Sequence, residues 1–149
     1  MTWNKPLPSL DEEIAPFWQA LKDREFRLFR CKICGAWYWP AAFCRFHDNE
    51  PLFGNMEWVK ASGRGKVFVY NIHYRAFHPG FKDDVPYVYA LIELEEGPMF
   101  GTRIVGCRPE EVKVGMPVEV IFEDITEEFT LPYFKPIEQS VKAKTNKLE

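Results

Sequence analysis

Cys31-Lys-Ile-Cys34-Gly35 and, nine residues after that glycine, Cys44-Arg-Phe-His47 decide how this chain is organised. Each segment places two residues between a pair of metal-binding side chains. Zinc in proteins takes four sulfur or nitrogen ligands in a tetrahedron, and a two-residue spacer lets one turn direct both side chains at the same ion. The sequence therefore predicts a zinc site made by Cys31, Cys34, Cys44 and His47.

The second ligand pair is weaker evidence than the first. Gly35 follows the first pair and accepts the backbone angles of a tight turn, whereas His47 follows Cys44 at a spacing shorter than that of a usual zinc finger. Three alternatives to His47 as the fourth ligand stay open. Asp48 or a water molecule could take that position, or the chain could have lost the metal and kept the loop. Cys107 is expected to be a buried apolar residue. Four protein ligands would close the shell and make the zinc structural.

A helical arm is predicted within residues 1–25. Ser9-Leu-Asp-Glu12 has the spacing of a capping box. Pro16 interrupts the apolar stripe that follows, because proline lacks an N–H donor and clashes with the preceding turn. We expect either two short helical pieces or one helix that begins near Ala15 and Pro16. The stripe consists of Leu10, Ile14, Phe17, Trp18 and Leu21.

Residues 26–55 are expected to form the zinc ribbon, with a first strand over 26–30. Trp37-Tyr38-Trp39 lies between the two ligand pairs, and a ribbon this small cannot bury such rings alone. They pack within this chain or against another chain, and packing within the chain is the first expectation. The candidates for a partner interface are Phe17, Trp18, Trp37 and Trp39.

From Met56 onward the apolar period becomes two residues, which predicts strands. One helical turn is expected over 109–115. Short antiparallel strands with such a turn before the last long strand predict an OB-type barrel over 56–137, and residues 138–149 are expected to form a flexible tail. The fold class is thus mainly β, with a helical arm, a zinc ribbon and a five- or six-stranded barrel. Strands are predicted at 56–60, 66–75, 87–95, 99–105 and 118–123, with a closing one near 129–134.

Charge and hydropathy limit the classes of function that fit this chain. Residues 61–137 carry eight basic and twelve acidic side chains, a balance unsuited to phosphate binding. A single-stranded nucleic-acid binder is therefore the alternative rather than the first hypothesis, although OB barrels often do that work. No apolar run approaches the roughly 18 residues of a membrane span, and no signal peptide is seen, so we expect a cytoplasmic protein. The possible stacking platforms are Phe68, Tyr70, Tyr74, Tyr87 and Tyr89.

Catalytic residues are not assigned. His73 and His78 are the candidates, with Asp83, Asp84 or Cys107 as conceivable partners. His73 falls on a predicted strand and His78 in a predicted loop, and these positions account for both histidines without a catalytic role.

The ordered set of motifs over residues 10–136 resembles a known family. The motifs are Phe17-Trp18, Leu28-Phe-Arg-Cys31-x2-Cys34-Gly35, Cys44, Glu57-Trp58, Ser62-Gly63-x-Gly65-x-Val67, Pro86-Tyr87, Ile92-Glu93-Leu94-x-x-Gly97, Val114-Gly115-Met116-x-Val118 and Leu131-Pro132-x-Phe134. The chain looks like the zinc-ribbon/OB-fold family of acyl-CoA-associated proteins, long catalogued as a domain of unknown function.

This resemblance implies a rubredoxin-like ribbon tied to an OB barrel, in the small zinc-finger subunit of a complex with a thiolase-superfamily enzyme, or with an acyl-CoA hydratase or aldolase. The resemblance also implies a counterpart in a thiolase of aromatic-compound degradation that has a zinc-finger subunit. The partner would supply the catalytic cysteine and histidines in a hetero-oligomer, for example two plus two. This chain would stabilise the partner and help shape its CoA or acyl channel. Loop residues Phe77, His78 and Phe81 are the candidates for that channel.

The second knuckle departs from the family pattern. The family has Cys-x2-Cys there, with an arginine shortly before it. Here His47 replaces the last cysteine, and Ala41-Ala42 stand where the arginine is expected. A four-cysteine site is therefore not carried over.

Overall fold

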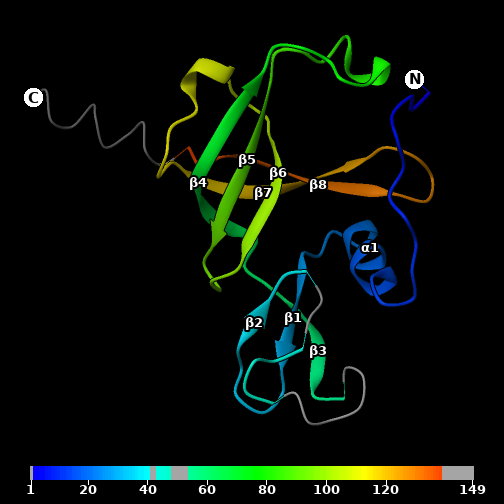
Figure 1. Ribbon diagram of the computed structural model, residues 1–149, viewed down its shortest axis with the longest axis vertical. Helices are drawn as coiled ribbons and strands as arrows, with labels where there is room; N and C mark the ends of the chain where they lie inside the picture. The colour runs from blue at the N-terminus through cyan, green and yellow to red at the C-terminus, as the bar shows by residue number, and fades with distance from the viewer. Residues whose placement is uncertain (1, 41–42, 48–53, 139–149) are drawn as a thin grey trace, which may run out of the picture.

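The computed structural model describes residues 2–40, 43–47 and 54–138. A single α-helix, a three-stranded sheet and a closed five-stranded barrel make up this part of the chain. Figure 1 shows the sheet at one end of the molecule, the barrel at the other and the helix beside their junction. The expected flexible tail lies, apart from Glu138, outside the described residues.

Helix α1 (Ala15–Lys22) carries Pro16 in its first turn, with Ile14 at the N-cap position. Of the two arrangements left open, the single late-starting helix is therefore correct. Ser9-Leu-Asp-Glu12 does not cap the helix, because a start at Ser9 would place Pro16 in the helix interior, where its ring would clash.

The small sheet has the order β2-β1-β3 and consists of β1 (Arg27–Cys31), β2 (Trp37–Tyr38) and β3 (Met56–Lys60). The expectation that Met56–Lys60 opens the barrel is wrong, since β3 pairs antiparallel with β1 from Cys31 opposite Met56 to Arg27 opposite Lys60. The cross-strand pair Phe29 and Trp58 brings two rings to 4.8 Å between centroids. A period of two identifies a strand but does not identify its partner.

The barrel confirms the predicted mainly β fold. Its strand order is β4-β5-β6-β8-β7, closed by pairing of β4 with β7. All pairs are antiparallel except β6 with β8, which is parallel. The strands are β4 (Arg64–His73), β5 (Tyr87–Leu94), β6 (Met99–Ile104), β7 (Pro117–Asp124) and β8 (Thr130–Pro136), with 3-10 turns η1 (Pro79–Phe81) and η2 (Pro109–Glu111) between them.

Strand β4 contains a bulge that the alternating pattern does not predict. Val67 lies opposite Ile92 and Val69 lies opposite Leu91, so β4 has one extra residue at Phe68. An extra residue switches which side chains point inward. Val67 is buried, whereas Phe68 and Val69 are both exposed. Regular alternation would place Phe68 on the same face as Tyr70 and Ile72, which pack against the core, but Phe68 is exposed.

One aromatic core joins the helix, the small sheet and the barrel. The ring centroid of Phe17 in α1 lies 4.4 Å from that of Trp39 and 6.3 Å from that of Phe100 in β6. These rings lie where β6 and β8 share a single paired position, Ile104 with Phe134. Backbone pairing between β6 and β8 is thus short, and the arm and the ribbon pack against this part of the barrel.

Gly65 provides a test of the packing between β4 and β5. A Cβ atom at this position would lie 2.5 Å from the carbonyl oxygen of Glu93 and 2.7 Å from Cγ2 of Ile92. Because a paired backbone and a buried isoleucine cannot move away, we expect Gly65→Ala to lower the free energy of unfolding by about 1–3 kcal/mol in urea titrations. Gly101→Ala is the control, since its Cβ would meet the hydroxyl end of Tyr89, which is exposed and can turn away. Equal losses in the two variants would contradict this explanation.

An ion pair fastens the segment after α1 to the barrel. Both terminal nitrogens of Arg24 donate to Asp124 at 2.7 Å, and Thr130 Oγ1 donates to the same carboxylate at 2.6 Å. The Arg24 guanidinium, together with the Thr130 hydroxyl, holds the pKa of Asp124 well below its usual range.

This pair predicts an acid-dependent loss of stability. A carboxyl whose pKa is lower in the folded state stabilises the fold above about pH 3.9, its ordinary pKa, and the contribution is lost as the pH falls below that value. Urea titrations from pH 6 to pH 3 should therefore show a shallower loss for Asp124→Asn, which keeps an acceptor for Thr130. Parallel curves for the two proteins would show that the ion pair contributes nothing.

Candidate functional site

The structure brings the four predicted ligands together. One donor atom from each of Cys31, Cys34, Cys44 and His47 lies within 4.8 Å of every other. The Sγ atoms of Cys34 and Cys44 are 3.5 Å apart, and His47 Nδ1 lies 3.7 Å from Cys31 Sγ and 3.5 Å from Cys44 Sγ. All three cysteines are free thiols. The cluster can thus hold a metal ion.

The first knuckle is shaped by its glycine. Gly35 has a φ of 75°, which favours glycine, and its N–H donates to the Cys31 carbonyl at 2.9 Å. The Cys31 N–H in turn donates to the Ala36 carbonyl at 2.9 Å. This tight turn directs Cys31 and Cys34 to the same point.

Tyr38 in β2 orients the second knuckle. Its hydroxyl donates to Cys44 Sγ at 3.5 Å and accepts from the Arg45 N–H at 3.0 Å. The hydrogen bond from Tyr38 is the largest cause that lowers the pKa of Cys44 to about 6, and the same contact raises the pKa of Tyr38. Cys44 is therefore poised as a thiolate, which is the form that binds metals.

The donor spacing fits a tetrahedral ion. Metal–sulfur and metal–nitrogen bonds of about 2.3 and 2.05 Å predict donor separations of roughly 3.8 Å between sulfurs and 3.6 Å between sulfur and nitrogen. Three of the six separations, at 3.5 to 3.7 Å, lie close to these values, and the other three are within 4.8 Å. With four protein donors the shell is closed, so the ion would stabilise the fold and leave no position for a substrate. Asp48 lies outside the described residues, and Cys107 follows β6 in the barrel.

The aromatic residues predicted at a partner interface mostly face inward. Phe17 is 1% exposed, so its assignment to a surface contact is wrong. Trp18, Trp37 and Trp39 are half-buried against the same core. The sequence could not separate these cases, because a helical stripe looks alike whether it covers a barrel or a partner.

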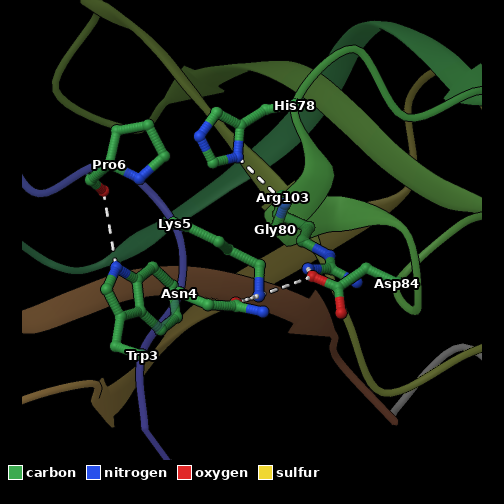
Figure 2. Close-up of polar contacts among 8 residues, drawn as sticks. All are labelled: Trp3, Asn4, Lys5, Pro6, His78, Gly80, Asp84 and Arg103. Atoms are coloured by element: carbon green, nitrogen blue, oxygen red, sulfur yellow. Dashed lines mark hydrogen bonds and ion pairs between the residues drawn. The ribbon is translucent and has the colours of Figure 1, made fainter.

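The 76–85 loop is anchored by the N-terminal segment. Figure 2 shows the His78 ring turned toward Gly80, whose N–H donates to His78 Nδ1 at 3.0 Å. A Cβ on Gly80 would collide with the Asn4 carbonyl oxygen, so the two backbones touch. Phe81 is half-buried, 5.7 Å from the Tyr87 ring, whereas Phe77 is fully at the surface. Of the three predicted channel residues, Phe77 and His78 are exposed and Phe81 is half-buried.

A charged cluster beside this loop escaped the sequence analysis. Lys5 Nζ lies 3.3 Å and Arg103 Nη1 3.0 Å from the same oxygen of Asp84, as Figure 2 shows. The Lys5 ammonium also lies 4.7 Å from the Trp3 ring centroid. Only the packing of residues 3–6 on the barrel brings these charges together, and no local motif signals that packing.

The candidate catalytic groups are engaged elsewhere. Asp84 pairs with Lys5 and Arg103, and the His73 ring stacks on the Tyr87 ring at 4.9 Å. In the part of the chain that the structure describes, no hydrogen bond joins either histidine to Asp84 or Cys107. Tyr87 lies between His73 and the Arg103 guanidinium, 4.8 Å from its ring centroid, so it is not a free stacking platform.

An aromatic groove of about 420 Å³ is lined by residues of β6 and β8 and by Trp3 and Pro6 of the N-terminal segment. No sequence pattern predicted this groove. Its walls include Trp18, Trp39, Tyr87, Tyr89, Arg103 and Tyr133.

Comparison with known proteins identifies the family. The family model described as the ChsH2 C-terminal OB-fold domain matches residues 58–123. A DUF35 domain-containing scaffold protein of Methanocaldococcus jannaschii is 39% identical over 136 residues, which cover 86% of this chain and 94% of that protein. This chain belongs to the DUF35 family. The resemblance carried by the ribbon and barrel motifs is thereby confirmed.

Two further similar proteins have the names of enzymes, one an enoyl-CoA hydratase subunit and the other an aldolase. The probable enoyl-CoA hydratase alpha subunit of Thermomonospora curvata is 34% identical over 134 residues. The aligned region covers 89% of this chain but only 40% of that protein. A solved chain described as the Ltp2-ChsH2(DUF35) aldolase superposes with a TM-score of 0.76 at 34% identity, covering 87% of this chain and 98% of that one.

Across residues 2–40, 43–47 and 54–138, no helix combines the length and the apolar character needed to cross a bilayer.

Proposed function

We propose that this DUF35 chain is a non-catalytic, metal-binding accessory subunit of an acyl-CoA-processing complex, with a thiolase-type subunit as its catalytic partner. The observation that carries the proposal is the 34% identity, over 98% of its length, to the DUF35 chain of the Ltp2-ChsH2(DUF35) aldolase. The names of the hydratase relative and of the scaffold relative support the acyl-CoA and accessory parts. The choice of a thiolase-type partner rests on the family resemblance of the motifs.

The chemistry of the chain supports a non-catalytic role. His78 accepts a hydrogen bond from its own loop, and Asp84 is paired with two cations. If all four donors of the cluster hold one ion, they would leave no open coordination position for a substrate. Catalytic groups would therefore come from the partner.

Zinc is the proposed metal. It favours tetrahedral sites of thiolate and imidazole, and such sites contribute directly to folding. Elemental analysis of protein purified without added metal should find about one zinc per chain. Less than about half an equivalent of zinc would contradict the assignment.

The proposed contacts with the partner and with acyl-CoA use surfaces beside the groove. Trp18 and Trp39 line the groove and Phe81 borders it, whereas Trp37 lies under the Arg30 guanidinium, 5.3 Å from its ring centroid. Phe77 and His78 lie on the adjoining loop. Together they would help shape the partner's acyl channel, and acyl-CoA would bind mainly to the partner.

Co-purification tests the proposal. The tagged chain, expressed in its own host, should elute from a sizing column with a larger subunit that carries a catalytic cysteine and histidines, identified by mass spectrometry. A strain that expresses the tag alone is the control. A chain that elutes as a monomer, with no acyl-CoA enzyme in its fractions, would contradict the proposal.

A further inference from the structure

Apolar side chains surround the metal cluster and point to solvent. Ile33 is 59% exposed, Phe46 is 76% exposed and Phe43 is 47% exposed. Each adjoins a ligand in the sequence, and the four donor atoms lie within 4.8 Å of one another, so all three residues lie next to the ligand cluster. Exposed apolar residues are common singly, but a group of this kind marks an interaction surface. We call Lys32, Ile33, Phe43, Arg45 and Phe46 the ribbon tip.

The two knuckles explain the outward direction. When both ligands of a pair turn toward one ion, the residues between them turn away from it. Ile33 lies between Cys31 and Cys34, and Phe46 lies between Cys44 and His47. The metal site that stabilises the ribbon thus also holds the tip in a fixed shape, which lowers the entropic cost of docking.

The tip is also basic. Residues 27–47 include four basic side chains and no aspartate or glutamate. Arg27 is bound to Glu25 at 2.7 Å, while Lys32 and Arg45 are exposed. Three thiolates and a neutral imidazole around a dication give a net charge of only about −1. Lys32 and Arg45 therefore give the tip itself positive charge, beside a barrel whose residues 61–137 carry four more acidic than basic side chains, although Asp48 and Glu50 follow the tip in the sequence.

We propose that the ribbon tip inserts into an apolar depression rimmed by aspartate and glutamate on the catalytic subunit. This inference rests on the proposed function and adds a second contact surface, separate from the residues beside the groove. Apolar anchors at the centre of a charged rim are the usual source of affinity in such contacts.

Other occupants fit less well. A second copy would have to bring its acidic barrel to this basic tip, and a contact between unlike surfaces builds open filaments unless the rotation closes a ring. A nucleic acid would need a track of several cations along its backbone, whereas the exposed cations of the tip are Lys32 and Arg45.

Matched substitutions test the tip. The probe is the catalytic subunit obtained by co-purification, stripped of this chain and titrated calorimetrically with each variant. Ile33→Ser and Phe46→Ser should each weaken binding at least about tenfold. Val114→Ser and Tyr74→Ser, which alter barrel side chains that are 67% and 73% exposed, should bind within about twofold of wild type. The double variant Lys32→Glu/Arg45→Glu should associate more slowly and lose the salt dependence of the wild type.

The outcomes separate this inference from the proposed function. Wild-type affinity in metal-loaded Ile33→Ser and Phe46→Ser overturns the inference and leaves the accessory role standing. A catalytic subunit that does not bind wild-type protein overturns both. Self-association of the wild-type chain that Phe46→Ser abolishes overturns the inference in favour of a second copy. A shift of labelled single-stranded RNA that Lys32→Glu/Arg45→Glu abolishes overturns it in favour of a nucleic acid. If a serine variant no longer binds its metal, the Lys32→Glu/Arg45→Glu variant provides the test instead. Slower association by that variant supports the inference, and wild-type association overturns it.

Discussion

Cys31→Ser will abolish stoichiometric metal binding and unfold the small sheet. Cys31 is buried at the end of the central strand β1, where it pairs with Met56 of β3. Structural zinc sites of this kind bind with about 10–16 kcal/mol, which is comparable with the whole stability of a domain at about 5–15 kcal/mol. Among the residues that the structure describes, the core cluster around the ligands is small and consists of Phe29, Cys31, Cys44 and Met56. The metal would therefore be the main source of stability at the ligand end of the sheet.

Metal analysis and tryptophan fluorescence measure this effect. Trp37 in β2 and Trp58 in β3 report on the small sheet, and their emission should shift to the red in Cys31→Ser. Cys107→Ser is the matched control, since Cys107 is a half-buried free thiol outside the cluster. It should keep one metal and the wild-type spectrum. A full equivalent of metal in Cys31→Ser would exclude the four-ligand site.

Phe17→Ala should have the second large effect, a loss of about 3–5 kcal/mol in the free energy of unfolding. Phe17 is 1% exposed and is the ring that connects all three parts of the fold. Removing it opens a cavity that neighbours from separate elements cannot close together. Its ring centroid lies 5.2 Å from that of Trp18, 6.2 Å from Phe26, 4.4 Å from Trp39, 6.1 Å from Trp58 and 6.3 Å from Phe100.

Urea titration measures this loss. Leu10→Ala serves as the control, because Leu10 lies on the same predicted stripe but is exposed, and it should change stability by less than about 0.5 kcal/mol. A loss below about 1 kcal/mol for Phe17→Ala would mean that the helix contributes little to the core.

Local chemistry made part of this molecule predictable. Ligand spacing placed Cys31, Cys34, Cys44 and His47 in one cluster, because two-residue turns fix the direction of neighbouring side chains whatever the rest of the fold does. Alternation likewise located the barrel strands to within a few residues. Both signals depend only on residues close together in the chain.

Features set by distant contacts were not predictable. The partner of β3 depends on the register of Cys31 with Met56, and the bulge at Phe68 depends on how β4 meets β5. The convergence of Lys5 and Arg103 on Asp84 joins three segments far apart in the sequence. Phe17 was misplaced for the same reason, since an apolar helix stripe does not reveal what covers it.

The proposed accessory role requires that this DUF35 chain support catalysis without performing it. The most direct test compares CoA release from acyl-CoA esters by the metal-loaded chain alone and by its co-purified complex, at equal concentration of the chain. We expect turnover by the complex and only the buffer rate from the chain alone. CoA release by the isolated chain at a rate comparable with that of the complex would contradict the account.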